Sequence, residues 1–104
     1  MITLALHIPQ DAIITWCERW QVVEFALFGS VLREDFHQNS DVDILITFAN
    51  DAQPTLFTLS EMSDELEALL GRPVDLLTRK GVEQSENYLR KNAILDSAQV
   101  IYAT

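Results

Sequence analysis

The sequence predicts an α+β fold, in which a small mixed β-sheet has helices packed on one face and a polar site on the other. Three short apolar runs of strand length, at residues 22–28, 41–48 and 73–78, alternate with segments whose apolar residues recur at helical spacing. The length of 104 residues, with 48% hydrophobic and 22% charged content, suits a single compact domain over residues 1–104 with a modest core.

The first predicted element is a helix from Pro9 to Trp20, because proline is favoured at a helix start and Ile13, Trp16, Cys17 and Trp20 form one apolar stripe. The chain has one cysteine, and its place in this stripe favours a small buried hydrophobic residue over a reactive thiol. A reducing cytoplasm suits that interpretation. The N-terminal residues lack the basic start and cleavage pattern of a signal peptide, and no run is long enough to span a membrane.

Residues 22–28 read VVEFALF and predict a buried strand. Gly29 permits a tight turn and a close approach of the backbone to a ligand, and Ser30 occupies the usual place of a helix N-cap residue. A helix is therefore expected at residues 30–37. Its first N–H groups lack partners within the helix and are suited to binding an anion.

The next strand, at residues 41–48, carries two carboxylates. Its side chains alternate, so Asp41 and Asp43 share one face with roughly 6.7 Å of rise between them. Carboxylates aimed together are unfavourable without a cation, and Mg²⁺ takes such oxygen ligands together with substrate phosphates. Asp75 alternates with Val74 and Leu76 in the strand at 73–78, and it joins the pair if the two strands are neighbours.

A polar loop at 50–54 precedes an amphipathic helix at 55–70, which Gly71 and Pro73 terminate. Its outer face is acidic, and it is either a solvated surface or a docking surface for a basic partner. The acidic residues are Glu61, Asp64, Glu65 and Glu67. After the strand at 73–78, a turn is expected at 79–81, a last helix from about 82 to 97, and a short apolar end at 100–102. The strands at 41–48 and 73–78 can be parallel or antiparallel.

Each part of the motif also has a plain structural interpretation, since Gly-Ser is a common turn and Asp-x-Asp often begins a solvated strand. By chance, the four fixed positions of Gly29-Ser30, ten residues, and Asp41-x-Asp43 occur in roughly one chain of this length in a thousand. With this motif and Asp75, the chain resembles the minimal nucleotidyltransferases of the DNA polymerase β superfamily. Within that superfamily it is similar to the small antitoxins paired with ribonuclease toxins of the HEPN (higher eukaryotes and prokaryotes nucleotide-binding) family.

The resemblance implies a polymerase β-like nucleotidyltransferase fold and Mg²⁺-dependent transfer of AMP from ATP to a hydroxyl of the cognate HEPN toxin. It implies that this hydroxyl belongs to a tyrosine. It implies that Asp41 and Asp43 hold two Mg²⁺ ions, and that Asp75 completes the shell of the second ion and helps to accept the proton. It also implies that Gly29 and Ser30 bind the nucleotide, and that Ser30 and the amides that follow it hold the leaving pyrophosphate.

Four further polar residues have two interpretations each. Arg33 either neutralises phosphate charge, as a nucleotide-binding residue, or is an exposed helix arginine. His37 is either a ligand or base near the metal strand or part of a polar loop. Arg90 and Lys91 either reach the ATP phosphates or form a solvated basic face.

The formal net charge of −9 argues against a nucleic-acid substrate, which would be repelled, and favours a basic protein partner. Two other functions compete with catalysis. One is an antitoxin that acts by direct binding alone, which has no need of three converging acids. The other is a module that senses ATP without transferring any part of it. An increment of AMP mass on a co-expressed partner distinguishes catalysis from both.

Overall fold

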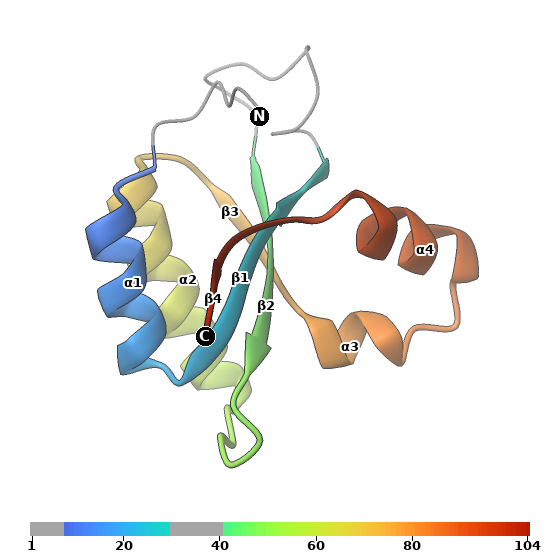
Figure 1. Ribbon diagram of the computed structural model, residues 1–104, viewed down its shortest axis with the longest axis horizontal. Helices are drawn as coiled ribbons and strands as arrows, with labels where there is room; N and C mark the ends of the chain where they lie inside the picture. Colours follow the sequence, from blue (N-terminus) through green and yellow to red (C-terminus); the bar gives the residue numbers. More distant parts are fainter. Residues whose placement is uncertain (1–7, 30–40) are drawn as a thin grey trace.

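Figure 1 shows the computed structural model, which describes residues 8–29 and 41–104. The elements, in chain order, are α1 (Gln10–Arg19), β1 (Val22–Phe28), β2 (Val42–Phe48), α2 (Leu56–Leu70), β3 (Val74–Thr78), α3 (Arg79–Glu83), α4 (Tyr88–Ser97) and β4 (Gln99–Ala103). The strands form a mixed sheet in the order β3-β2-β1-β4. In it β1 is antiparallel to β2 and β4, whereas β2 is parallel to β3. The predicted α+β class with a small mixed sheet is confirmed.

Local signals set the bounds of the early elements. The strand expected at 22–28 is β1, and the helix expected at 55–70 is α2. Thr55 caps the start of α2, where its hydroxyl accepts a hydrogen bond from the Thr58 backbone N–H at 3.2 Å. Gly71 ends the helix in the left-handed conformation, with φ of 69°, and its N–H donates to the Glu67 carbonyl at 2.8 Å. The helix predicted at 30–37 lies outside the described residues.

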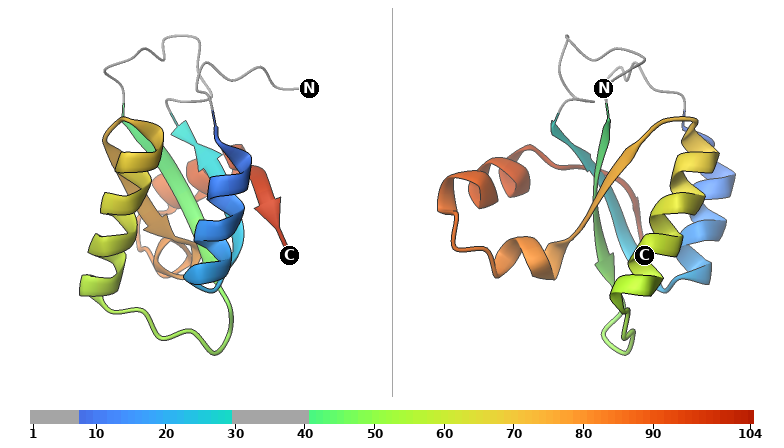
Figure 2. Two further views of the ribbon diagram at one scale, coloured as in Figure 1. Left: turned by 90° about the vertical axis from the view of Figure 1, so that its left-hand side faces the viewer. Right: turned by 180° about the vertical axis from the view of Figure 1, so that it is seen from behind.

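Helices α1 and α2 cover one face of the sheet (Figures 1 and 2). Trp16 of α1 meets Phe25 of β1 edge to face, with 5.8 Å between ring centroids. Burial raises the pKa of the Cys17 thiol to about 12, with a smaller contribution from the charge of Glu18, and the interpretation of Cys17 as a buried hydrophobic residue is confirmed. The core under these helices consists of Ile13, Trp16, Cys17, Val22, Phe25, Leu27, Val42, Ile44, Ile46, Met62 and Leu66. Of the helices in the described ranges, none has the length and apolar character to cross a lipid bilayer.

The second face of the sheet differs from expectation, because α3 and α4 pack against part of it (Figures 1 and 2). The central strands carry apolar residues on both faces, and a second core forms here from Ala26, Phe28, Leu45, Val82 and Ile94. The sheet face that was expected to be open is therefore partly covered by these two helices.

The C-terminal part of the chain corrects two predictions. Residues 79–81, expected as a turn, begin α3, because the Thr78 hydroxyl accepts a hydrogen bond from the Gly81 N–H at 3.1 Å and caps a helix there. The last helix begins at Tyr88 and not near residue 82, because Asn87 caps it by accepting from the Arg90 N–H at 3.1 Å. The apolar end at 100–102 belongs to β4, which pairs with β1.

Two acids on the outer side of α2 have structural contacts. Glu65 accepts a hydrogen bond from Trp20 Nε1 at 3.0 Å and forms an ion pair with Arg19 at 3.0 Å, so it ties α2 to α1. Glu67 accepts from the Val74 N–H at 3.0 Å and holds the start of β3. The other two acids of this face are exposed. Half of the predicted acidic face therefore stabilises the fold.

Candidate functional site

The turn after β1 lies directly against the carboxylate of Asp43. Phe28, the last residue of β1, is the register partner of Asp43 in β2, and Gly29 follows with φ of 69°. A Cβ atom on Gly29 would collide with Asp43 Oδ2 and lie 3.1 Å from Asp43 Cγ. Only glycine fits here without strain, because its backbone conformation and the space beside it both exclude a side chain. The close backbone approach expected of Gly29 is thus made with one of the predicted site acids.

Asp75 is brought beside Asp43 by the pairing of β2 with β3. The strands are parallel and in a register that pairs Asp43 with Asp75, so the two side chains lie on the same face of adjacent strands, about 4.8 Å apart along the hydrogen-bonding direction. The Val42 N–H donates to the Pro73 carbonyl at 2.9 Å and fixes this register at its start. Asp43 is half-buried and Asp75 is exposed. The condition set for Asp75, that its strand neighbours the strand of Asp43, is met.

Asp41 immediately precedes β2 and is exposed at the rim of this site. Within residues 8–29 and 41–104, no group of three His, Cys, Asp or Glu side chains is placed to hold a metal ion. Mutual repulsion of the carboxylates disfavours a tight acid cluster without a cation. Mg²⁺ is usually bound through one or two carboxylates, water and substrate phosphates, and the neighbouring Asp43 and Asp75 provide donors of this kind.

The remaining predicted site residues Ser30 and Arg33, together with His37, lie outside the described residues. Glu24 shares the site's face of β1 but precedes Phe28 by four residues, which places it about 13 Å along the strand from the turn. Its carboxylate pairs with Arg79 at 3.3 Å. Glu24 therefore belongs to the opposite end of the sheet from Asp43.

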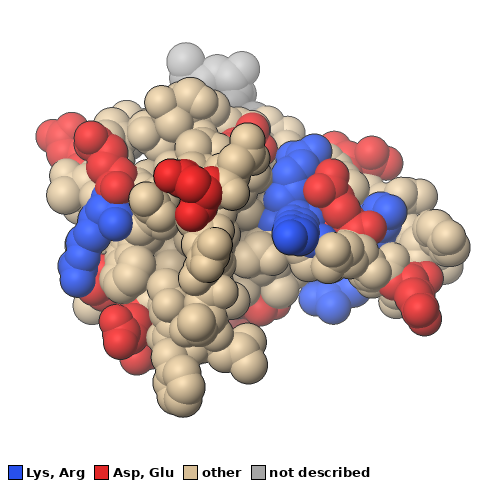
Figure 3. Space-filling model, turned by 90° about the horizontal axis from the view of Figure 1, so that it is seen from below, with Lys and Arg blue, Asp and Glu red and all other residues tan. Residues whose placement is uncertain are grey.

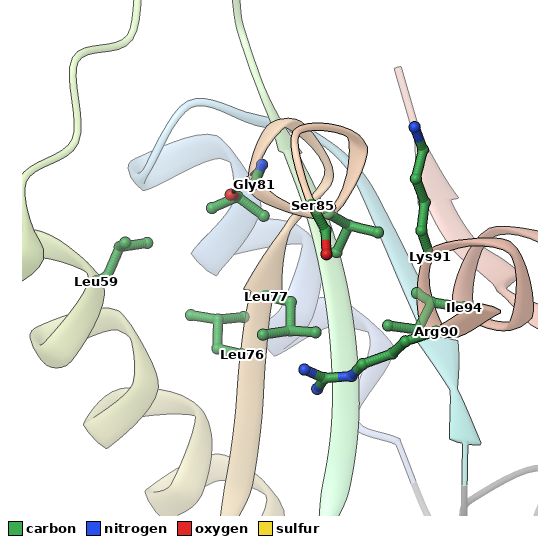
Figure 4. Close-up of a pocket in the computed structure, with 10 residues that line it drawn as sticks. Leu59, Leu76, Leu77, Gly81, Ser85, Arg90, Lys91 and Ile94 are labelled. Atoms are coloured by element: carbon green, nitrogen blue, oxygen red, sulfur yellow. Dashed lines mark hydrogen bonds between the residues drawn. The ribbon is translucent and has the colours of Figure 1, made fainter. Parts of the chain in front are cut away.

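A cavity of about 350 Å³ lies between β3, α3 and α4 (Figure 4). The polar residues of its lining are Thr78, Ser85, Arg90 and Lys91. Much of the apolar part is formed by Leu76, Leu77, Val82 and Ile94. No sequence pattern indicated Ser85 as a lining residue, because the cavity combines residues from separate elements.

The fold and the arrangement of Gly29, Asp43 and Asp75 are those expected of a nucleotidyltransferase domain. Residues 13–101 match the family model of the nucleotidyltransferase domain, and the chain belongs to this family. The resemblance inferred from the sequence is thereby confirmed.

Relatives within the family are named protein adenylyltransferases. One, from Methanocaldococcus jannaschii and named so provisionally, is 33% identical over 75 residues, which cover 72% of this chain and 73% of the relative. The protein adenylyltransferase MntA of Thermococcus cleftensis is 41% identical over 66 residues, covering 64% of this chain and 65% of the relative.

Solved structures share the fold. A structure described as a minimal nucleotidyltransferase is 30% identical, with a TM-score of 0.66, and the match covers 86% of each chain. A toxin–antitoxin structure with AMP-PNP has a TM-score of 0.71 at 21% identity, covering 93% of this chain and 75% of the other. A complex of the tri-AMPylated Shewanella oneidensis HEPN toxin with its MNT antitoxin has a TM-score of 0.62 at 20% identity, covering 91% and 70%.

Proposed function

We propose that this protein is a cytoplasmic antitoxin that transfers AMP from ATP to a hydroxyl group, that of a tyrosine, on a cognate HEPN toxin and so neutralises it. Its membership of the nucleotidyltransferase domain family and its relatives named protein adenylyltransferases support the transfer chemistry. The observation that carries the proposal is the contact between the Gly29 turn and the Asp43 carboxylate, with Asp75 on the neighbouring strand.

The turn and the acids have complementary tasks in this reaction. The Gly29 backbone has no side chain in the way of a phosphate, and the turn places it beside the carboxylate of Asp43. Asp43 and Asp41 would hold Mg²⁺ ions, and Asp75 would complete the shell of the second ion on the acceptor side. Bound Mg²⁺ would supply Lewis acidity and neutralise phosphate charge.

Asp75 also serves the acceptor hydroxyl. A tyrosine has an unperturbed pKa of about 10, so it carries its proton at neutral pH and must lose it during transfer. The carboxylate of Asp75 is exposed and belongs to the edge strand β3, which supports a role in which it would help to accept that proton from an incoming protein side chain.

The charge of the chain favours a protein acceptor. A net charge of −9 repels nucleic acid and attracts a basic surface, so the acceptor is expected to be a basic protein. We accordingly propose no direct binding of nucleic acid or membrane.

The test is to incubate the purified protein with its toxin, ATP and Mg²⁺ and to measure the mass of the toxin. The wild type should add AMP increments at substoichiometric amounts, and EDTA should abolish them. Asp43→Asn should lose transfer by orders of magnitude, whereas Asp64→Asn, which removes an equal charge from an exposed position on α2, should retain it.

A second measurement separates catalysis from docking. If Asp43→Asn, expressed in excess, protects cells from the toxin as well as the wild type does, neutralisation is steric and the proposal is wrong. A wild-type protein that binds ATP and the toxin but adds no AMP would point to a sensing module.

A further inference from the structure

The start of β3 is held from both sides, directly before Asp75. On the inner side, the Pro73 carbonyl accepts a hydrogen bond from the Val42 N–H at 2.9 Å, which joins β3 to β2. On the outer side, the Val74 N–H donates to the Glu67 carboxylate of α2 at 3.0 Å. Asp75 is the next residue of the strand, so these two hydrogen bonds fix the backbone from which its side chain extends.

The outer hydrogen bond matters because β3 is an edge strand. The sheet order β3-β2-β1-β4 leaves one side of β3 without a neighbouring strand. Alternate N–H groups of such a strand point away from the sheet, and the Val74 N–H is bonded to a side chain of α2. Glu67 therefore takes the place of a further strand at the point where β3 begins.

Glu67 lies in the last turn of α2, where a carboxylate is unfavourable by itself, since the carbonyl end of a helix carries partial negative charge. The chain holds 16 Asp and Glu residues, and Figure 3 shows acidic side chains spread over separate parts of one face of the molecule, so acidity alone does not distinguish Glu67. Its contacts do. The Glu67 carboxylate binds the start of β3, and its backbone carbonyl accepts from the Gly71 N–H at 2.8 Å. Glu67 thus joins the end of α2 to the strand of Asp75.

Packing beneath α2 sets the face to which Asp75 belongs. Val74 and Leu76 pack against the core under α1 and α2, so alternation places Asp75 on the opposite face, the face of Asp43. A displacement of the Val74 backbone passes to Asp75 through a single peptide unit. Groups in a catalytic site must be held to within roughly 0.5 Å of their working position, so a loose start of β3 would impair Asp75.

We propose that Glu67 is a positioning residue for the transfer reaction, in which its carboxylate holds the Val74 N–H and so keeps Asp75 in place beside Asp43. The inference rests on the proposed function, because that reaction gives Asp75 its task. Glu67 is assigned no contact with the nucleotide or the acceptor, and it acts through Asp75.

The first experiment compares AMP transfer by three variants of α2 at a temperature where all are folded. Glu67→Ala should lower kcat about tenfold with little change in the KM for ATP, because Asp75 serves the acceptor side. Glu67→Gln keeps an acceptor oxygen for the Val74 N–H and should retain most of the activity. The matched control Glu65→Ala removes an acid of the same helix that contacts α1, and it should keep the wild-type kcat.

Three results of this comparison would overturn the inference. They are a wild-type kcat in Glu67→Ala, equal losses in Glu67→Ala and Glu65→Ala, and a Glu67→Gln variant as slow as Glu67→Ala. A double-mutant cycle adds a test of the route. In the Asp75→Asn background, Glu67→Ala should lower kcat by less than about twofold, since the group that it positions is already lost, and a further tenfold loss would exclude action through Asp75.

Hydrogen exchange gives a second readout that needs no activity. Relative to the amides of β1, those of Val74 and Asp75 should exchange about tenfold faster in Glu67→Ala than in the wild type, Glu67→Gln or Glu65→Ala. Wild-type exchange rates at both amides in Glu67→Ala would show that Glu67 does not hold this backbone, and the inference would be wrong.

The two readouts separate this inference from the proposed function. If the wild type adds AMP to the toxin and Glu67→Ala does so with the same kcat, Glu67 is not a positioning residue and the proposed function stands. If the wild type adds no AMP but the Val74 and Asp75 amides respond as expected, Glu67 fixes the backbone at Asp75 and the proposed function is wrong.

Discussion

Replacing Gly29 with alanine tests whether the turn is built around the carboxylate of Asp43. Two costs are combined in this variant. An L-residue in the left-handed conformation, at φ of 69°, costs about 1–2 kcal/mol. The added Cβ would also collide with Asp43 Oδ2 and lie 3.1 Å from Cγ, so the carboxylate must move.

The chain offers a matched control for the first cost. Gly71 has the same φ of 69°, and a Cβ added there meets nothing within 4 Å. Gly71→Ala should therefore lose about 1–2 kcal/mol of the free energy of unfolding and keep its transfer activity. Each kcal/mol corresponds to a fall in Tm of about 4–8 °C for a domain near this size.

The difference between the two variants isolates the contact with Asp43. Gly29→Ala should lose at least as much stability as Gly71→Ala and, in addition, about 100-fold in kcat, since a shift of about 1 Å in a reacting group has an effect of this size. Urea unfolding and AMP transfer to the toxin, both at a temperature where the variants are folded, give the two quantities. Equal activities for Gly29→Ala and Gly71→Ala would refute the reasoning.

Three other predictions follow from described contacts. Asp75→Asn should lower kcat for AMP transfer with little change in the KM for ATP, because it removes an interaction on the acceptor side; near-normal turnover would exclude this role. Glu65→Ala should cost about 1–2 kcal/mol in urea unfolding, since the Trp20 N–H then loses its acceptor, whereas the exposed Asp64→Ala should cost less than about 0.5 kcal/mol; equal losses would contradict the contact. The raised pKa of Cys17 means that the unfolded state releases the thiol proton first, so stability should fall as pH rises from 9.0 toward about 12; the variant Cys17→Ala should lack this contribution to the pH dependence of unfolding.

Elements with local signals were predictable from the sequence. The continuous apolar run at residues 22–28, rich in β-branched and aromatic residues, predicted β1 with its observed bounds, and the left-handed residue Gly71 ended α2 where expected. The pairing of Gly29-Ser30 with Asp41-x-Asp43 was sufficient to indicate the family. These features depend on backbone preferences and spacing within a few residues, which the sequence contains directly.

The C-terminal part shows where local signals compete. Arg79-Lys80-Gly81 has the composition of a turn, yet the Thr78 hydroxyl caps a helix there. The end at 100–102 is too short to identify as a strand by itself, and its partner β1 makes it one. Packing of Val82 and Ile94 against the sheet also covers part of a face that alternation alone left open.

The sequence by itself determined the class of fold, the bounds of its central strands and the residues of the acid motif. Only the tertiary structure decided that β3 is parallel to β2 and that Asp75 is the register partner of Asp43. It also decided that Gly29 lies against the Asp43 carboxylate and that Arg90 reaches a cavity beside β3. The physical reason is that strands pair through backbone hydrogen bonds common to all residues, so partner and register depend on how the whole chain buries its apolar faces.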